Sequence, residues 1–129
     1  MNFAEYVTSK RNTKKIPTDI QQRWQERVIA RGLHKQVKIL AGLTPLKSAG
    51  MAKYMRDSVA GLSVPDYYIQ RLEAAKDKAA EGIKICVEQI QRLRQVEGVA
   101  GIHLMAIEWE KFVPQIVQEA GLLPRPVLN

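Results

Sequence analysis

The chain has 129 residues, of which 46% are hydrophobic and 26% are charged, and its net charge is +7. This length allows one ordinary domain with a modest core. No apolar run approaches the roughly 18 residues that a membrane span needs, and the charged start of the chain is not followed by the apolar segment of a secretory signal. A single cysteine, Cys86, excludes an internal disulfide and fits a cytoplasmic protein.

The positive charge is concentrated in the first part of the chain. Residues 1–53 hold 11 Lys/Arg and 3 Asp/Glu, whereas residues 54–129 hold 9 and 10. A basic half can bind nucleic acid or an anionic ligand, or it can be a solvated tail and an exposed helix face. We favour the second interpretation, because no aromatic residues alternate with the basic ones as stacking platforms. Residues 1–18 are therefore predicted to be a basic, poorly ordered arm before a folded part at 19–129.

The first element predicted in chain order is a helix from about Asp19 to Arg31. A capping-box pattern precedes it, and Gly32 follows it as a stop signal. Apolar residues recur at helical spacing, which indicates one buried face: Ile20, Trp24 and Val28.

The run from Val37 to Gly42 is the first predicted strand. Because the run is almost continuously apolar, we expect its side chains, including those of Val37 and Leu40, to be buried on both faces. A loop from Leu43 to Ser48 follows. Ser48 can cap a short helix that continues to Met55.

Two helices are predicted next, one from Asp66 to Ala75 and a long one that ends near Val96. A bend at residues 76–77 separates them. The long helix carries a core-facing stripe at three- and four-residue steps, formed by Ala79, Ile83, Cys86, Val87, Ile90 and Leu93. Within this stripe Cys86 is expected to be a buried, inert thiol, and Gly82 to permit close packing on the sheet.

The last predicted strand runs from Val99 to Ile107, between Gly98 and a polar turn that starts at Glu108. A helix follows from Pro114 to Ala120, and Gly121 stops it. The two strands should lie parallel and adjacent, with mostly helical chain between them. The predicted fold class is therefore α/β and helix-rich, with about two parallel strands, and functional groups are expected at their carboxyl ends.

Four segments of this chain resemble the methylenetetrahydrofolate reductase family, especially its bacterial and archaeal branch. The segments are VKILAGLTPLKSAGM at 37–51, AKDKA at 75–79, EGIKI at 81–85 and GVAGIHLMAIEWEKFVPQIVQEAGLLPRP at 98–126. They are long, unusual and in unbroken order, and the resemblance extends from about Asp19 to Pro126.

The resemblance implies that residues 19–129 are the C-terminal part of a (β/α)8 TIM barrel, namely its last βα units. A complete barrel of this kind needs about 250 residues. Complete enzymes of the family bind FAD and transfer hydride to methylenetetrahydrofolate from a reduced nicotinamide. The groups that hold most of the flavin come from earlier strands, which this sequence does not show, so we expect no FAD on this chain alone.

By position in the family, the end of the last strand contacts flavin and folate. This implies Ile107 and Trp109 as cofactor contacts, provided that another chain completes the barrel. The loops at the same end offer three candidate substrate-binding residues, Thr44, Lys47 and Glu108. Lys47 could hold a carboxylate or phosphate, although no glycine-rich cradle surrounds it.

Other polar residues have two interpretations each. Glu108 and Glu110 could serve as a general acid or base, or they could simply be favourable charges at a positive helix end, which we favour. His103 could be a satisfied core residue, which we favour, or a group lining the barrel interior. No catalytic residue is assigned, and two distant histidines without a cysteine pair predict no metal site.

Three functions are compatible with these observations. The favoured one is a subunit or fragment of a methylenetetrahydrofolate reductase-like flavoprotein, inactive until another chain supplies the missing strands. The second is a non-catalytic interaction module that assembles with a partner or with itself. The third, which the charge pattern favours least, is a nucleic-acid-binding protein. Open strand edges predict association in either of the first two cases, and a homo-oligomer would bring Ile102, Leu104 and Ala106 to the interface.

Overall fold

A computed structural model of the chain describes residues 20–60 and 64–127, with side chains from residue 25 onward. The predicted arm at 1–18, and with it the start of the capping-box pattern before the first helix, lies outside the described residues. The elements in chain order are α2 (Ile20–Ala30), η1 (Leu33–Lys35), β1 (Ile39–Leu43), α3 (Ala49–Ser58), α4 (Asp66–Ala74), α5 (Lys78–Leu93), β2 (Val99–Leu104), η2 (Glu110–Phe112) and α6 (Val113–Glu119).

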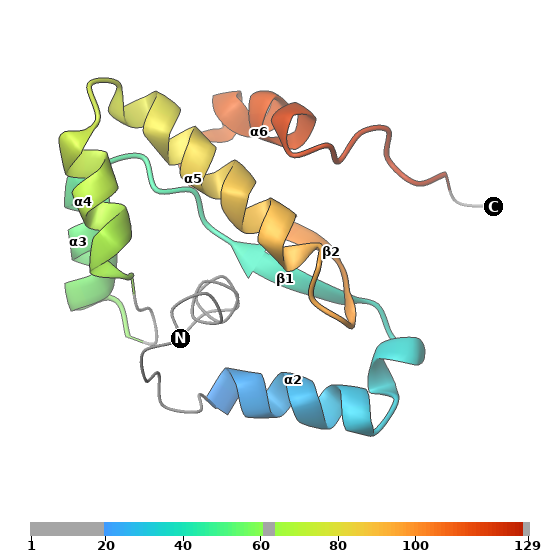
Figure 1. Cartoon of the computed structure of the whole chain (residues 1–129). Coiled ribbons are helices and arrows are strands. Elements are labelled where there is room, and N and C mark those ends of the chain that lie inside the picture. The colour runs from blue at the N-terminus through green and yellow to red at the C-terminus, as the bar shows by residue number, and fades with distance from the viewer. Residues whose placement is uncertain (1–19, 61–63, 128–129) are drawn as a thin grey trace.

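The two strands form a parallel pair, as the sequence predicts. Ile39 pairs with Val99 and Leu43 with Leu104, and β2 accommodates one extra residue between Ile39 and Leu40 of the partner strand. Helix α5 crosses one face of this pair, α6 lies beside α5, and α2 lies at the end of the molecule where the strands begin (Figure 1). The fold class is thus helix-rich α/β with two parallel strands, and it matches the last βα units of a barrel.

Helix α5 forms the centre of the core. Asp77 caps it by accepting a hydrogen bond from the Ala80 N–H at 3.0 Å, which satisfies one of the free donors of the first turn. The predicted stripe is confirmed: its buried members pack with Ala41 and Leu43 of β1 and with Ile116 of α6. The helix ends at Leu93, three residues before the predicted end at Val96.

A second buried cluster lies between the other side of α5 and the pair α3 and α4. Ser48 caps α3, as predicted, by accepting a hydrogen bond from the Met51 N–H at 3.1 Å. The cluster consists of Leu46, Ala52, Met55, Val64, Tyr68, Ile69, Leu72 and Ile85. Because both clusters contain side chains of α5, this helix joins the sheet to the α3–α4 pair.

Gly82 allows α5 to approach the loop that follows β1. A Cβ atom at this position would lie 2.1 Å from the Leu46 carbonyl oxygen and 3.1 Å from the Trp109 ring. The first of these contacts is impossible without a backbone shift. Gly82 therefore permits close packing, but its partner is the loop at the carboxyl end of β1 and not the sheet that the sequence predicts.

The prediction that the strands are buried on both faces is wrong for the described residues. Val37 precedes β1 and is 59% exposed, and Leu40 on the open face of β1 is also 59% exposed. The described helices cover only one face of the sheet. Ile102, Leu104 and Ala106 lie on the covered face and are partly buried by the core cluster, and their part in association stays a prediction.

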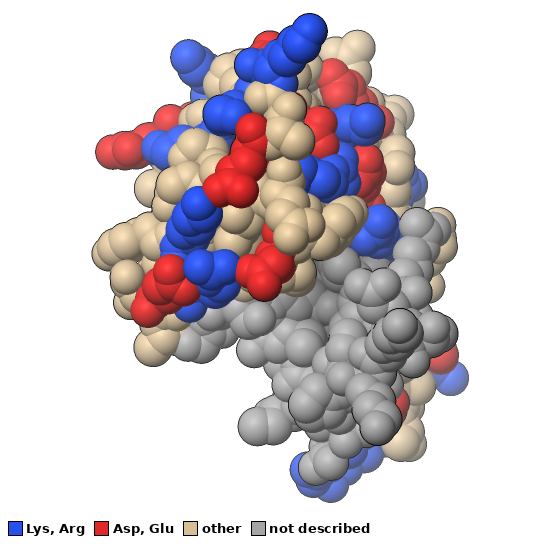
Figure 2. Space-filling model, turned by 60° about the vertical axis from the view of Figure 1, so that its left-hand side comes forward, with Lys and Arg blue, Asp and Glu red and all other residues tan. Residues whose placement is uncertain are grey.

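The surface over α3, α4 and the start of α5 mixes both charge signs, as Figure 2 shows. Arg71 bonds Glu81 and Glu88, each at 2.7 Å. The hydrogen bond from Arg71 to Glu88 holds the pKa of the Glu88 carboxyl below its ordinary value. Arg56 bonds Asp57 and Asp66, at 2.7 and 2.6 Å. Arg56 and Arg71 on this face are therefore neutralised by neighbouring carboxylates.

The contact at Gly82 generates a prediction for stability. Gly82→Ala should lower the free energy of unfolding by about 2 kcal/mol or more, because the strain of overpacking exceeds the gain of about 1 kcal/mol in helix propensity. The measurement is urea unfolding followed by circular dichroism.

Gly50→Ala in α3 is the matched control. Its added methyl group would find no atom closer than the Ser48 hydroxyl at 3.9 Å. The control should keep or raise stability by up to about 1 kcal/mol. If both variants were equally stable, the close approach at Gly82 would have no energetic weight.

Candidate functional site

The carboxyl ends of β1 and β2 meet at one edge of the sheet. Leu43 and Leu104 are register partners, and the Met105 N–H donates a hydrogen bond to the Leu43 carbonyl at 2.8 Å. The segments after the two strands therefore leave the sheet side by side. In parallel α/β folds this edge carries the functional groups.

Two of the predicted substrate-binding residues meet at this edge. Lys47 Nζ lies 3.2 Å from Glu108 Oε2, although 61 positions separate them in sequence. The Lys47 side chain is half-buried and that of Glu108 is exposed. Thr44, the third candidate, lies half-buried in the same loop. An exposed ion pair contributes little to stability, so each partner can exchange the other for a charged group of a ligand at small cost.

Glu108 has an unusual backbone conformation. Its φ is +56°, in the left-handed region that residues other than glycine rarely adopt. Its N–H donates to Glu110 Oε1 at 3.2 Å. The Glu110 side chain thus stabilises the backbone of the turn before η2 and α6. The turn directs the Glu108 carboxylate towards Lys47.

The two predicted cofactor contacts have different environments. Ile107 is 66% exposed, whereas Trp109 is only 8% exposed. The Trp109 ring packs on Phe112, with 4.8 Å between the ring centroids, and on the α5 turn at Gly82. The Ile107 side chain is therefore free to contact a ligand, whereas the Trp109 ring is occupied by the core.

His103 is exposed and lies in β2 next to Leu104 and Met105, on the open face of the sheet. The interpretation of His103 as a core residue is wrong, and the alternative, a group on the interior side of a barrel, agrees with its position. The physical reason is the alternation of side chains along a strand, which places Leu104 towards the helices and its neighbours away from them.

Cys86 is fully buried in the core cluster, and its burial raises the pKa of the thiol to about 12. A thiol of this kind stays protonated at neutral pH and is a poor nucleophile. The prediction that the Cys86 thiol is buried is confirmed.

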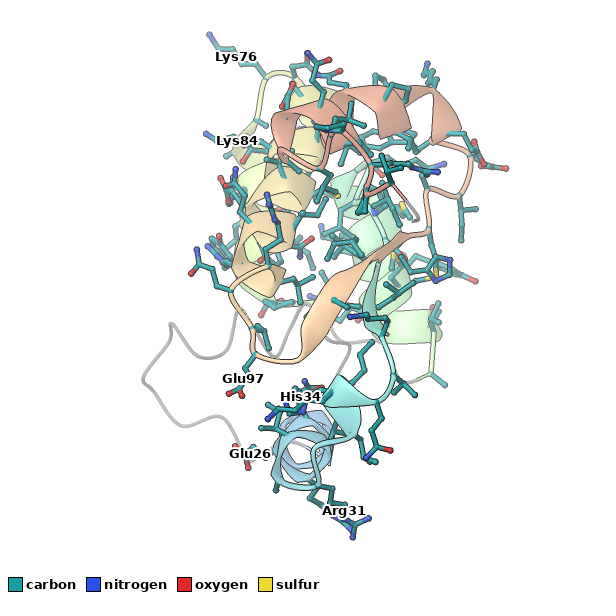
Figure 3. All side chains as sticks on the ribbon, turned by 90° about the vertical axis from the view of Figure 1, so that its right-hand side faces the viewer. Glu26, Arg31, His34, Lys76, Lys84 and Glu97 are labelled. Carbon is teal, nitrogen blue, oxygen red and sulfur yellow. The ribbon has the colours of Figure 1, made fainter. Side chains whose placement is uncertain are left out.

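A polar cluster at the opposite end of the sheet was not anticipated from the sequence. Gln25 of α2 is 1% exposed, and its amide donates to the Glu97 carbonyl at 2.9 Å. Gly98, with φ of +85°, lies so close that an added Cβ would be 2.8 Å from the Gln25 amide nitrogen. Figure 3 shows His34 and Glu97 at this end, where the strands begin. The available signal in the sequence was the position of Gln25, three residues before Val28 and beside the apolar stripe, which could have indicated a buried amide.

A cluster of metal ligands and a membrane-spanning helix are both absent from the part of the chain that the structure describes. Within it, no three His, Cys, Asp or Glu residues are grouped so that they could hold a metal ion. Within the same residues, no helix is both long and apolar enough to cross a membrane.

Comparison with known proteins gives one match. The family model described as methylenetetrahydrofolate reductase matches residues 16–121. No curated protein and no solved structure matches the chain. The matched range contains both strands and the Lys47–Glu108 pair.

The backbone of Glu108 can be tested with two substitutions that both remove its carboxylate. Glu108→Gly should be more stable than Glu108→Ala by about 1 kcal/mol, because glycine adopts the left-handed region without the steric cost that alanine has. Thermal or urea unfolding of both variants measures the difference. Lys47→Met, which removes the same ion pair without a backbone change, should alter stability by less than about 1 kcal/mol. Equal stability of the Gly and Ala variants would contradict the strained turn.

The thiol of Cys86 should react with an aromatic disulfide reagent at pH 8 at least about a hundredfold more slowly in the native chain than in urea. Burial both raises its pKa and blocks access. Absorbance of the released thiolate measures the rate. Equal rates with and without urea would show that Cys86 is accessible.

Proposed function

The chain belongs to the methylenetetrahydrofolate reductase family, and we propose that it forms the last part of a barrel of this family, as a subunit or fragment that is inactive by itself. The family places it in folate one-carbon metabolism. The observation that carries the proposal is the Lys47–Glu108 pair, at 3.2 Å, at the carboxyl end of two parallel strands. Barrel enzymes build their sites from loops at this end.

Lys47, Glu108 and Thr44 are the proposed contacts for the folate. Folates carry carboxylates and a pterin ring with hydrogen-bond donors and acceptors. The Lys47 ammonium can bind a carboxylate, and the Glu108 carboxylate can accept hydrogen bonds from ring N–H groups. Both side chains are partly or largely exposed, so a ligand can reach them without unfolding the loop.

The residues at this edge fit one wall of a flavin site. Ile107 presents an exposed apolar side chain beside the Lys47–Glu108 pair, which suits contact with a planar ring system. FAD, which enzymes of the family use, supplies hydride transfer when bound. Trp109 supports this wall from behind, because its ring packs between Phe112 and the Gly82 turn.

A partner must supply the rest of such a site. The described sheet has two strands, with one open edge on each, and its open face carries the exposed apolar side chains of Leu40, Met105 and Ile107. Open edges and apolar faces favour pairing with further strands, and closure is what protects them in a barrel. We infer a partner chain that contributes the missing strands, or a homo-oligomer, in the cytoplasm.

Co-expression tests the proposal. The chain should be produced alone and together with a polypeptide comprising the first six βα units of a bacterial methylenetetrahydrofolate reductase. The chain alone should retain no FAD, because two strands and their loops do not enclose a flavin. The complex should show a flavin absorption spectrum near one FAD per complex, and it should reduce its folate substrate.

Within that complex Lys47→Ala should raise the KM for the folate about tenfold or more, with a smaller change in kcat, because it removes a binding contact. Lys76→Ala, in the α4–α5 turn, is the matched control and should leave both constants unchanged. A complex that forms without flavin would favour the non-catalytic interaction module. Retention of stoichiometric FAD by the isolated chain would contradict the need for a partner.

A further inference from the structure

A groove of about 790 Å³ runs along β2, and Leu40 of β1 is among the residues that line it. Besides Leu40, its walls come from the strand residues 99–104, from Ile90 and Arg94 at the end of α5, from Val113 and Val117 on α6, and from the segment that follows α6. Figure 3 shows α6 and this last segment on one side of β2, and α2 at the far end of the molecule.

The groove has the properties of a place for one more strand. β2 pairs only with β1 among the described residues, so alternate residues of β2 direct N–H and C=O groups into the groove. Val113 and Val117 are half-buried and line the groove from above, where a helix would cover a neighbouring strand. An extended segment there could bond the edge of β2 and bury its apolar side chains against α6.

The charge of the groove restricts what can fill it. Arg94 and Arg125 both line it, and none of the described residues in its lining is an aspartate or a glutamate. Neither arginine forms an ion pair with any residue that the structure describes. Arg94 is held at the groove by hydrogen bonds from Nη1 to the carbonyls of Ala120 and Gly121, at 3.1 and 3.4 Å.

We propose that this groove binds an extended segment of a different polypeptide, which adds to the free edge of β2 and places a carboxylate against Arg94 and Arg125. The proposal rests on the proposed function, since the segment would be one of the strands that complete the barrel. It specifies the edge at which that strand docks and the charge that the strand carries.

A second copy of this chain does not fit the groove. The strands that the structure describes, Ile39–Leu43 and Val99–Leu104, contain no acidic residue, and the acidic residues nearest to β2, Glu97 and Glu108, lie outside the strand. The net charge of +7 would also oppose self-association. Charge complementarity therefore favours a partner with acidic strand ends.

A synthetic peptide tests the proposal on the whole chain. The probe has two glutamates at its amino end followed by alternating valine and threonine, about eight residues in all, the length of an ordinary strand. Backbone amide NMR signals report binding. The signals of residues 99–104 should shift on titration. The same peptide with lysines in place of the glutamates should bind at least about tenfold more weakly.

Arg125→Glu is the main variant, because Arg125 lies in the exposed segment after α6 and forms no ion pair among the described residues. It should weaken the binding of the glutamate peptide about tenfold and strengthen the binding of the lysine peptide. Arg94→Lys is the second variant: it keeps the charge at the end of α5 and should retain most of the binding. Lys76→Glu, which makes the same charge change far from the groove (Figure 3), is the control and should leave both affinities unchanged.

Three results would overturn the proposal: equal binding of the two peptides, shifts confined to residues outside the groove, or absence of binding at millimolar peptide. Light scattering tests for the other candidate occupant of the groove, a second copy of the chain. A dimer of the chain that the glutamate peptide dissociates would show that the groove holds a second copy instead. None of these measurements uses flavin or folate. The proposal for the groove can therefore be contradicted while the proposed function is upheld, and the proposed function can be contradicted while the proposal for the groove is upheld.

Discussion

The approach of α5 to the loop after β1 is the constraint on which the other contacts depend. At Gly82 the helix lies so close to the Leu46 carbonyl that there is no room for a Cβ atom. This contact fixes where the helix starts relative to the sheet, and hence which of its faces meets β1 and which meets α3 and α4. It also positions the Trp109 ring, which lies against the same turn and anchors the segment after β2.

The candidate site follows from that arrangement. The loop that contains Lys47 is held by the helix contact at Leu46, and the turn that contains Glu108 is held by Trp109 on the next residue. Two exposed, charged side chains are therefore displayed on backbone that is anchored by buried neighbours one position away. This is how a rigid core can present groups that remain free to bind a ligand.

The sequence predicted most of the elements because their signals are local. Capping by Ser48, the stripe on α5 and the stop at Gly121 each depend on residues within one or two turns, and the structure contains all three. The parallel pairing was also predictable, since two apolar runs with helices between them have few alternatives. The bond between Gln25 and Glu97 spans 72 positions. The apolar stripe beside Gln25 could indicate that its amide is buried, but no local pattern could indicate its partner.

The error about strand burial has a different cause. A run such as Val99 to Ile107 predicts burial on both faces because, in a complete parallel sheet, helices cover one face and other strands or side chains cover the other. The described residues supply only the helical side, so Leu104 is covered and Leu40 and Ile107 are not. The sequence pattern thus describes the surroundings for which the strands are suited, and the structure shows how much of those surroundings the described residues provide.

The strands are suited to burial on both faces, whereas the described residues cover only one face. This difference is the physical basis for expecting a partner. On the open face Leu40 already reaches over Gly101, and Met105 over Gly42, so that an added Cβ would lie 3.0 and 3.2 Å from their side chains. These large apolar side chains fill the spaces at the two glycines and form one continuous surface across both strands. Exposing such a surface to water is unfavourable in proportion to its area. A second layer would cover this apolar surface, and an added strand would pair with the free edge of β2. Together they would remove the exposure of the apolar surface and the unpaired backbone groups of the edge.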